Sequence, residues 1–130
     1  MAIRTRLTEA LGISAPILSA PMGFVAGGKL AAAVTAAGGL GIIGGGYGDA
    51  DWLDREFTAA GNARVGCGFI TWSLANQPEL LARVMARSPA VLMLSFGEDP
   101  FSGPAPDQFR GEAVVFMNNH AFARRTASLR

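Results

Sequence analysis

The sequence is poor in the residues that build metal and redox sites. Its 130 residues include one cysteine, Cys67, and one histidine, His120. A lone cysteine excludes an internal disulfide and a cysteine metal cluster, and one residue of each kind does not make a zinc site of the usual type. We therefore expect no metal, and the low cysteine content favours a reducing, cytoplasmic setting.

The sequence also lacks an excess of charge and a long apolar run. Lys and Arg number 11 against 10 Asp and Glu, a formal net charge of +1. This balance lacks the basic excess of a nucleic-acid-binding protein. No apolar run reaches the ~18 residues that span a bilayer, and the first residues are too charged for a signal-peptide core. We expect neither a nucleic-acid partner nor a membrane partner.

Apolar residues make up 50% of the chain and gather in short runs bounded by Gly and Pro. Short continuous runs of this kind are typical of buried parallel strands. The expected strands are residues 15–22, 39–44, 63–70, 90–96 and 113–117.

The segments between the first four runs predict helices. Asp49 is the expected N-cap of the second helix and Gly61 its end, while Pro78 suits the first turn of the third. The residues expected on the buried faces of the three helices are Leu30, Ala33, Val34 and Ala37, then Leu53, Phe57 and Ala60, then Leu80, Leu81, Val84 and Met85. Around the second helix we expect a solvated acidic face of Asp49, Asp51, Asp54 and Glu56. The fourth connection contains Pro100, Pro104 and Pro106 and reads as a loop.

Alternating strands and helices predict βαβ units and a parallel α/β sheet. Two architectures fit, an open doubly wound sheet and part of a (β/α)₈ barrel. A complete barrel takes about 250 residues, so a barrel of this length is half of one. In both architectures, ligands bind in the loops that follow the strands.

Glycine is concentrated at these loops, most densely in "GGLGIIGGGYG" from Gly38 to Gly48. The stretch 39–44 matches the G-x-G-x-x-G dinucleotide fingerprint literally. We reject this assignment because the fingerprint needs its glycines between a strand and a helix, whereas Leu40, Ile42 and Ile43 look like the strand itself. Small residues here either let a backbone approach a flat ring or simply allow tight turns.

Each of the remaining candidate functional residues also has a purely structural interpretation. Phe69 and Trp72 follow the third strand and either wall an apolar pocket or cover the core. Cys67 lies between two glycines in an apolar run and reads as a small buried residue rather than a nucleophile. His120, near the end of the fifth strand, is either a catalytic base or, as we favour, an exposed residue.

Three stretches in order, "PILSAPMGFVAGGKLAAAVTAAGGLGIIGGGY", "RVGCGFITWSL" and "VLMLSFGEDPF", resemble the nitronate monooxygenases, formerly called 2-nitropropane dioxygenases. The resemblance covers residues 5–101 and is faint over residues 102–130. It implies an FMN-dependent (β/α)₈ TIM barrel that oxidises alkyl nitronates with O2 to carbonyl compounds and nitrite. The chain, 1–130, would then be a single partial barrel domain, its N-terminal half.

The resemblance also implies site residues. Four residues of the first loop would lie against the flavin ring, with Gly68 nearby on the third strand. The implied cofactor-binding residues are Ala20, Pro21, Met22, Gly23 and Gly68. The expected lining of the substrate pocket is Gly45, Gly46, Phe69 and Trp72.

The family's catalytic histidine, in a "GGH" stretch, and its phosphate-binding loops would lie beyond residue 130, and His120 does not match that motif. We therefore expect a truncated form without the catalytic histidine, and we assign no catalytic residue. Two alternatives stay open: a non-catalytic half-barrel fragment, and a protein similar to FMN-type enoyl-acyl carrier protein reductases. A half-barrel has open sheet edges, which predict self-association.

Overall fold

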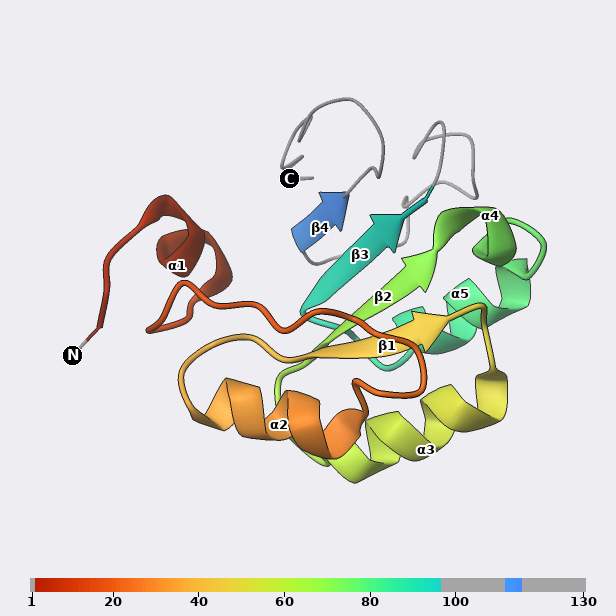
Figure 1. The fold of residues 1–130 in the computed structure, drawn as a ribbon, viewed down its shortest axis with the longest axis horizontal. Helices are drawn as coiled ribbons and strands as arrows, with labels where there is room; N and C mark the ends of the chain where they lie inside the picture. Colours follow the sequence, from red (N-terminus) through yellow and green to blue (C-terminus); the bar gives the residue numbers. More distant parts are fainter. Residues whose placement is uncertain (1, 97–111, 116–130) are drawn as a thin grey trace.

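The chain is built around a parallel sheet whose strands lie in chain order (Figure 1). The computed structural model describes residues 2–96 and 112–115. Each strand pairs in parallel with the next one along the chain. The strands are β1 (Ile42–Gly46), β2 (Gly66–Ile70), β3 (Val91–Ser95) and β4 (Glu112–Val115).

This order separates the two expected architectures. A doubly wound sheet reverses its strand order at a switch point, whereas a barrel adds each new strand beside the previous one. The order β1-β2-β3-β4 contains no reversal. The barrel arrangement is therefore the one that the described residues adopt. Because β1 begins within 39–44, the rejection of the dinucleotide fingerprint is also confirmed.

The expected first strand, residues 15–22, is wrong as a strand. It runs beside β1 in extended form, with a single bridge between Leu18 and Leu40. Ser19 replaces a ladder bond, because its Oγ accepts the Ile42 N–H at 2.8 Å. Pro16 and Pro21 lack backbone N–H groups and therefore shorten any ladder in this segment.

Helices cover one side of the sheet, with α2 and α3 beneath β1 in Figure 1. The three expected helices are present, and two short ones, α1 and α4, were not predicted. The helices are α1 (Arg6–Leu11), α2 (Gly28–Ala36), α3 (Ala50–Ala60), α4 (Thr71–Leu74) and α5 (Pro78–Met85). A signal for α1 was available, since Thr5 and Thr8 form a reciprocal capping box.

The faces predicted for α3 and α5 are confirmed. Asp49 caps α3 by accepting the Trp52 N–H at 2.7 Å, and Gly61 ends the helix. The α3 stripe is buried, and on α5 Leu80 and Val84 are buried while the two flanking apolar residues are half-buried.

The face predicted for α2 is wrong. Leu30 is 48% exposed, and the buried residues are Gly28 and Ala31. A Cβ at Gly28 would collide with the carbonyl oxygen of Glu56, and one at Gly41 would collide with the backbone of Ala31. Such close contact admits only small residues, so α2 turns its small side inward and its larger side outward.

A second, smaller core closes the end of the sheet where the strands begin. Leu11 of α1 packs there with Leu40 and Val91, and all three are buried. The Arg64 guanidinium donates a 2.7 Å hydrogen bond to the Leu11 carbonyl, which ties α1 to the segment before β2. This end therefore supports stability, and the opposite end is left for a site.

Candidate functional site

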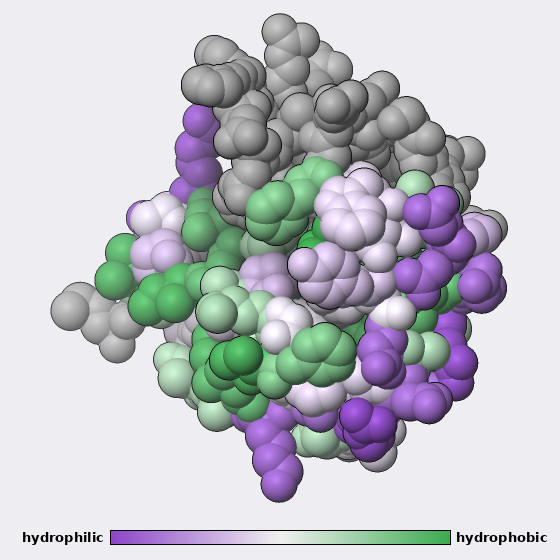
Figure 2. Space-filling view, turned by 45° about the vertical axis from the view of Figure 1, so that its right-hand side comes forward, coloured by the Kyte–Doolittle hydropathy of each residue, from purple (hydrophilic) through white to green (hydrophobic). Residues whose placement is uncertain are grey.

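The candidate site lies where the parallel strands end. The loop 20–27, the turn 46–48 after β1 and the helix α4 after β2 meet at this end of the sheet. Figure 2 faces this end and shows apolar and weakly polar side chains gathered at its centre, with strongly polar ones along one side.

The structure brings together the residues predicted to bind the cofactor. A Cβ on Gly68 would collide with the ring of Pro21, so the two residues lie in direct contact. The backbone of Gly23 likewise lies against Gly46. Ala20 is exposed, as is Met22 at 57%. The first loop therefore crosses β1 and β2 and leaves Ala20 and Met22 exposed, with Pro21 and Gly23 half-buried.

The glycines of β1 make room for this loop. A Cβ on Gly44 would collide with the Met22 carbonyl. Gly46 has a φ of 53°, and the pairing of β1 with β2 shifts register between Gly44 and Gly46. Bulges of this kind are common beside active sites. The space left by Gly44 and Gly68 is thus filled by the loop, and the exposed surface is the loop itself with Gly46.

Two residues expected in the substrate pocket lie on the other side of the sheet. Phe69 is 3% exposed and belongs to the core beneath the helices. Gly45 faces the same way, since a Cβ there would lie 2.6 Å from the Phe69 ring. Of the two roles considered for Phe69, the geometry supports covering the core.

Trp72, in contrast, is 57% exposed at the strand ends. It makes an edge-to-face contact with Tyr47, with ring centroids 5.7 Å apart. The Tyr47 carbonyl accepts hydrogen bonds from Ser73 Oγ at 2.6 Å and from Gln77 Nε2 at 2.9 Å. Tyr47 was missed in the sequence, although its place directly after the glycine run was a signal.

Two of the four acidic residues predicted to form a solvated face around α3, Asp49 and Asp51, are exposed, whereas Asp54 and Glu56 are half-buried and make specific contacts. Asp49 is the helix cap, and Glu56 Oε2 accepts the Gly28 N–H at 2.8 Å. Asp54 pairs with Arg83 and Arg87 of the neighbouring helix region, and chiefly the hydrogen bond from Arg83 lowers its pKa. The predicted solvated face is therefore wrong for Asp54 and Glu56.

These carboxylates also bear on phosphate binding. A helix N-terminus attracts phosphate through its free N–H groups. In the described chain, the start of α2 already holds Glu56 and the start of α3 holds Asp49, while α5 begins with Pro78 and Glu79. The starts of α2, α3 and α5 are therefore not free to bind the phosphate of a ligand.

Neither the candidate nucleophile, Cys67, nor the candidate base, His120, is placed in the site. Burial raises the pKa of the Cys67 thiol well above its usual range, as expected for a structural residue. His120 lies outside the described residues.

A shallow cavity of about 120 Å³, lined in part by Phe57, Arg64 and Arg87, lies at the other end of the strands. No helix within the described ranges is long and apolar enough to cross a membrane.

Solved structures show the same fold. The chain is similar to FabK from Thermotoga maritima, with a TM-score of 0.70 and 26% identity over 88% of this chain and 37% of that one. A mutant of that protein gives a TM-score of 0.69 and 26% identity, with coverages of 87% and 39%. With the consecutive strand order, these likenesses show the N-terminal half of a (β/α)₈ TIM barrel.

A curated relative covers less of the chain. It is the (3aS,4S,5R,7aS)-5-hydroxy-7a-methyl-1-oxo-octahydro-1H-indene-4-carboxyl-CoA dehydrogenase of Mycobacterium tuberculosis, 51% identical over 43 residues. The aligned part is 33% of this chain and 12% of the relative. The chain therefore spans well under half the length of the proteins it matches.

The sequence model of one family, described as nitronate monooxygenase, matches residues 4–67. This range holds the first loop, β1 and the start of β2, the segments that build the candidate site. Over this N-terminal region, the chain matches the nitronate monooxygenase family.

Proposed function

We propose that this chain forms the flavin-ring side of the active site of an FMN-dependent oxidoreductase that oxidises alkyl nitronates with O2 to carbonyl compounds and nitrite. One observation carries the proposal: the first loop, with Pro21 on Gly68 and Gly23 on Gly46, crosses the sheet at the candidate-site end and leaves Ala20 and Met22 exposed. Barrel enzymes bind their ligands at this end.

In this proposal, Ala20, Pro21, Met22 and Gly23 hold the flat face of the ring. When bound, FMN supplies the redox chemistry of the reaction. Tyr47 and Trp72 form a fixed aromatic wall beside the ring, which suits the apolar part of a nitronate. The phosphate is held by residues outside those described.

The first test is whether the purified chain binds flavin and then consumes O2 when an alkyl nitronate is added. Because the catalytic histidine implied by the family has no counterpart among the described residues, we expect FMN binding without rapid turnover. A folded chain that cannot be loaded with FMN would remove the basis of the proposal.

A second candidate is a reductase similar to the FMN-type enoyl-acyl carrier protein reductases. The observation in its favour is the similarity to the Mycobacterium tuberculosis relative, which is named as a dehydrogenase of a carboxyl-CoA compound. NADH separates the two candidates, because nitronate oxidation does not need a nicotinamide. Flavin reduction by NADH in the loaded chain would favour the reductase.

We also propose that the chain associates with a second copy of itself. A half-barrel fragment has open sheet edges that favour such association, whether or not it is catalytic. Ile17 is 59% exposed on the first segment, whose backbone partners among the described residues lie at 38–40. Leu30 is exposed on the outer side of α2. This apolar surface belongs to the side of the sheet where a closed barrel would continue.

A further inference from the structure

We propose that Trp52 and Glu56 of α3 are positioning residues that hold the middle and the C-terminal end of the first loop in place. The loop, residues 20–27, contains the four residues assigned to the flavin ring, so its relevance to FMN rests on the proposed function. The positioning itself rests on contacts in the described chain alone.

Both side chains project from one face of a fixed helix. Residues four apart on a helix lie one above the other, so Trp52 and Glu56 point the same way. Asp49 caps α3 through the N–H of Trp52 itself, at 2.7 Å. Both side chains are half-buried. The helix therefore presents them to the loop from a rigid base.

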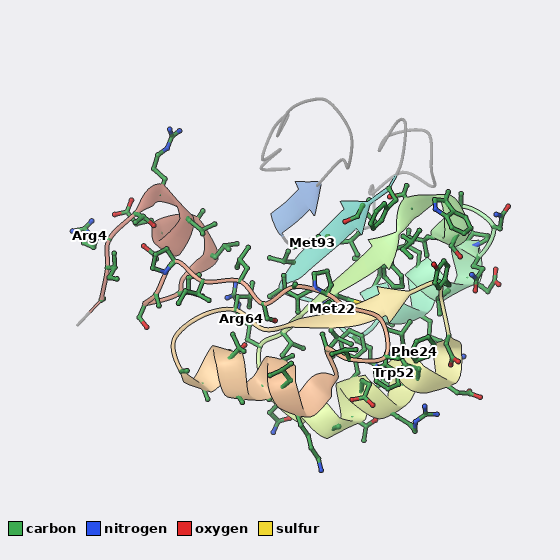
Figure 3. The ribbon with its side chains drawn as sticks, in the orientation of Figure 1. Arg4, Met22, Phe24, Trp52, Arg64 and Met93 are labelled. Carbon is green, nitrogen blue, oxygen red and sulfur yellow. The ribbon has the colours of Figure 1, made fainter. Side chains whose placement is uncertain are left out.

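Trp52 joins the loop to the end of β1. Its indole Nε1–H donates a 3.0 Å hydrogen bond to the Gly44 carbonyl. Its ring meets Phe24 of the loop edge to face, with centroids 5.3 Å apart and planes at 60°. Figure 3 shows Phe24 and Trp52 side by side at the turn of the loop. Gly44 is also the residue covered by the Met22 carbonyl.

Phe24 shows why the loop needs such a contact. Its φ is 58°, in the left-handed region that bulky residues rarely adopt, and its side chain is 61% exposed. Non-glycine residues remain in this region only where the surroundings hold them. In the described chain, the Trp52 ring is the aromatic partner that holds Phe24.

Glu56 fixes the C-terminal end of the loop, where α2 begins. Its Oε2 accepts the Gly28 N–H at 2.8 Å, at the N-terminus of α2, where a negative charge is favoured. Glycine is required at 28, because a Cβ there would collide with the Glu56 carbonyl oxygen, and a Cβ on Gly27 would displace the Glu56 carboxylate. Between the two contacts, Ala26 donates to the Met22 carbonyl at 2.8 Å and accepts the Gly44 N–H at 2.9 Å.

The consequence is a loop clamped at Phe24 and at Gly28, with its ligand-facing residues next to the first clamp. A site held in its bound geometry pays less to order itself when the ligand arrives. Removing either clamp should therefore loosen the loop before it affects the sheet.

The test is hydrogen exchange of the loop amides in Trp52→Leu, Trp52→Phe, Glu56→Ala and Glu56→Gln. We expect the Val25, Ala26 and Gly28 amides to exchange at least about fivefold faster in Trp52→Leu and Glu56→Ala, the change that corresponds to one hydrogen bond of ~1 kcal/mol. Glu56→Gln keeps an acceptor oxygen and should restore slow exchange at Gly28.

Trp52→Phe keeps an aromatic ring but loses the N–H, so it separates the two contacts of Trp52. We expect it to retain protection at Val25, because its ring keeps the contact with Phe24. Asp54→Ala is the matched control, because it breaks ion pairs of the same helix without touching the loop. Unchanged loop exchange in both Trp52→Leu and Glu56→Ala would overturn the proposal.

FMN titration of the same variants separates this proposal from the proposed function. If the wild type binds FMN, Trp52→Leu and Glu56→Ala should bind it at least about tenfold more weakly, a difference of ~1.4 kcal/mol, while Asp54→Ala binds normally. Equal affinity in all of them would contradict the link to the flavin. If the wild type does not bind FMN, the proposed function fails and the exchange data still decide the positioning role.

Discussion

At the scale of single residues, burial controls the reactivity of the Cys67 thiol. It is fully buried between β2 neighbours, and desolvation of the thiolate raises its pKa. We predict that a thiol reagent labels Cys67 only when the chain opens, so the labelling rate should follow the unfolding equilibrium as denaturant is added. Fast labelling of the native chain at neutral pH would contradict this placement.

The glycine run shows how far residue-level prediction reaches. Its position at a strand end and its role at a site were predicted from composition and spacing. Which partner each glycine faces was not, because Met22 against Gly44 and Pro21 against Gly68 are contacts between distant segments. Tyr47 was missed for the same reason, since its neighbours Trp72 and Ser73 come from beyond the next strand.

At the scale of elements, Asp54 links α3 to Arg83 in α5 and to Arg87 just after it, at 3.2 Å. Its lowered pKa fixes the sign of the pH effect. The stabilisation is present above the ordinary carboxyl pKa of 3.8 and is lost as pH falls through the lowered value. We predict that Asp54→Asn is less stable than the wild type at neutral pH.

Denaturant unfolding at several pH values measures this effect. The difference in unfolding free energy between wild type and Asp54→Asn should shrink below the ordinary pKa and disappear below the lowered one. Asp51→Asn, which removes an exposed carboxylate from the same helix, should show a smaller difference at neutral pH. A difference for Asp54→Asn that stays constant down to strong acid would rule out the ion pairs as its source.

The elements themselves were largely predictable. Periodicity and caps located α3 and α5, including Asp49 and Pro78, because these signals are local. The face of α2 was not predictable from periodicity. Its helix is apolar on several sides, and the contact of Gly28 with α3 decided which side turned inward. The first segment failed as a strand because its prolines cannot donate.

At the scale of the whole molecule, the exposed apolar side of α2 and the first segment predicts self-association. We expect sedimentation equilibrium to show a concentration-dependent increase in mass. Leu30→Glu should weaken this association about tenfold, ~1.4 kcal/mol, with little effect on thermal unfolding, since Leu30 is 48% exposed. Ala59→Glu places the same charge on an exposed position of α3 and is the matched control. A monomer at all concentrations would contradict the prediction.

The central claim, that the first loop forms the ring side of an FMN site and is held against Gly46, is tested most directly by FMN titration of the wild type, Gly46→Ala and Gly12→Ala. Gly46 and Gly12 both have positive φ, 53° and 63°, so alanine strains each backbone similarly, at ~1–2 kcal/mol. A Cβ at Gly46 would press on the first loop, 3.3 Å from Gly23 Cα, whereas one at Gly12 meets open space.

We predict that the wild type and Gly12→Ala quench FMN fluorescence with the same affinity and that Gly46→Ala binds at least about tenfold more weakly. Comparable melting temperatures for the two variants would show that the loss belongs to the site and not to stability. FMN binding that is absent from the wild type, or equal in all three proteins, would contradict the account.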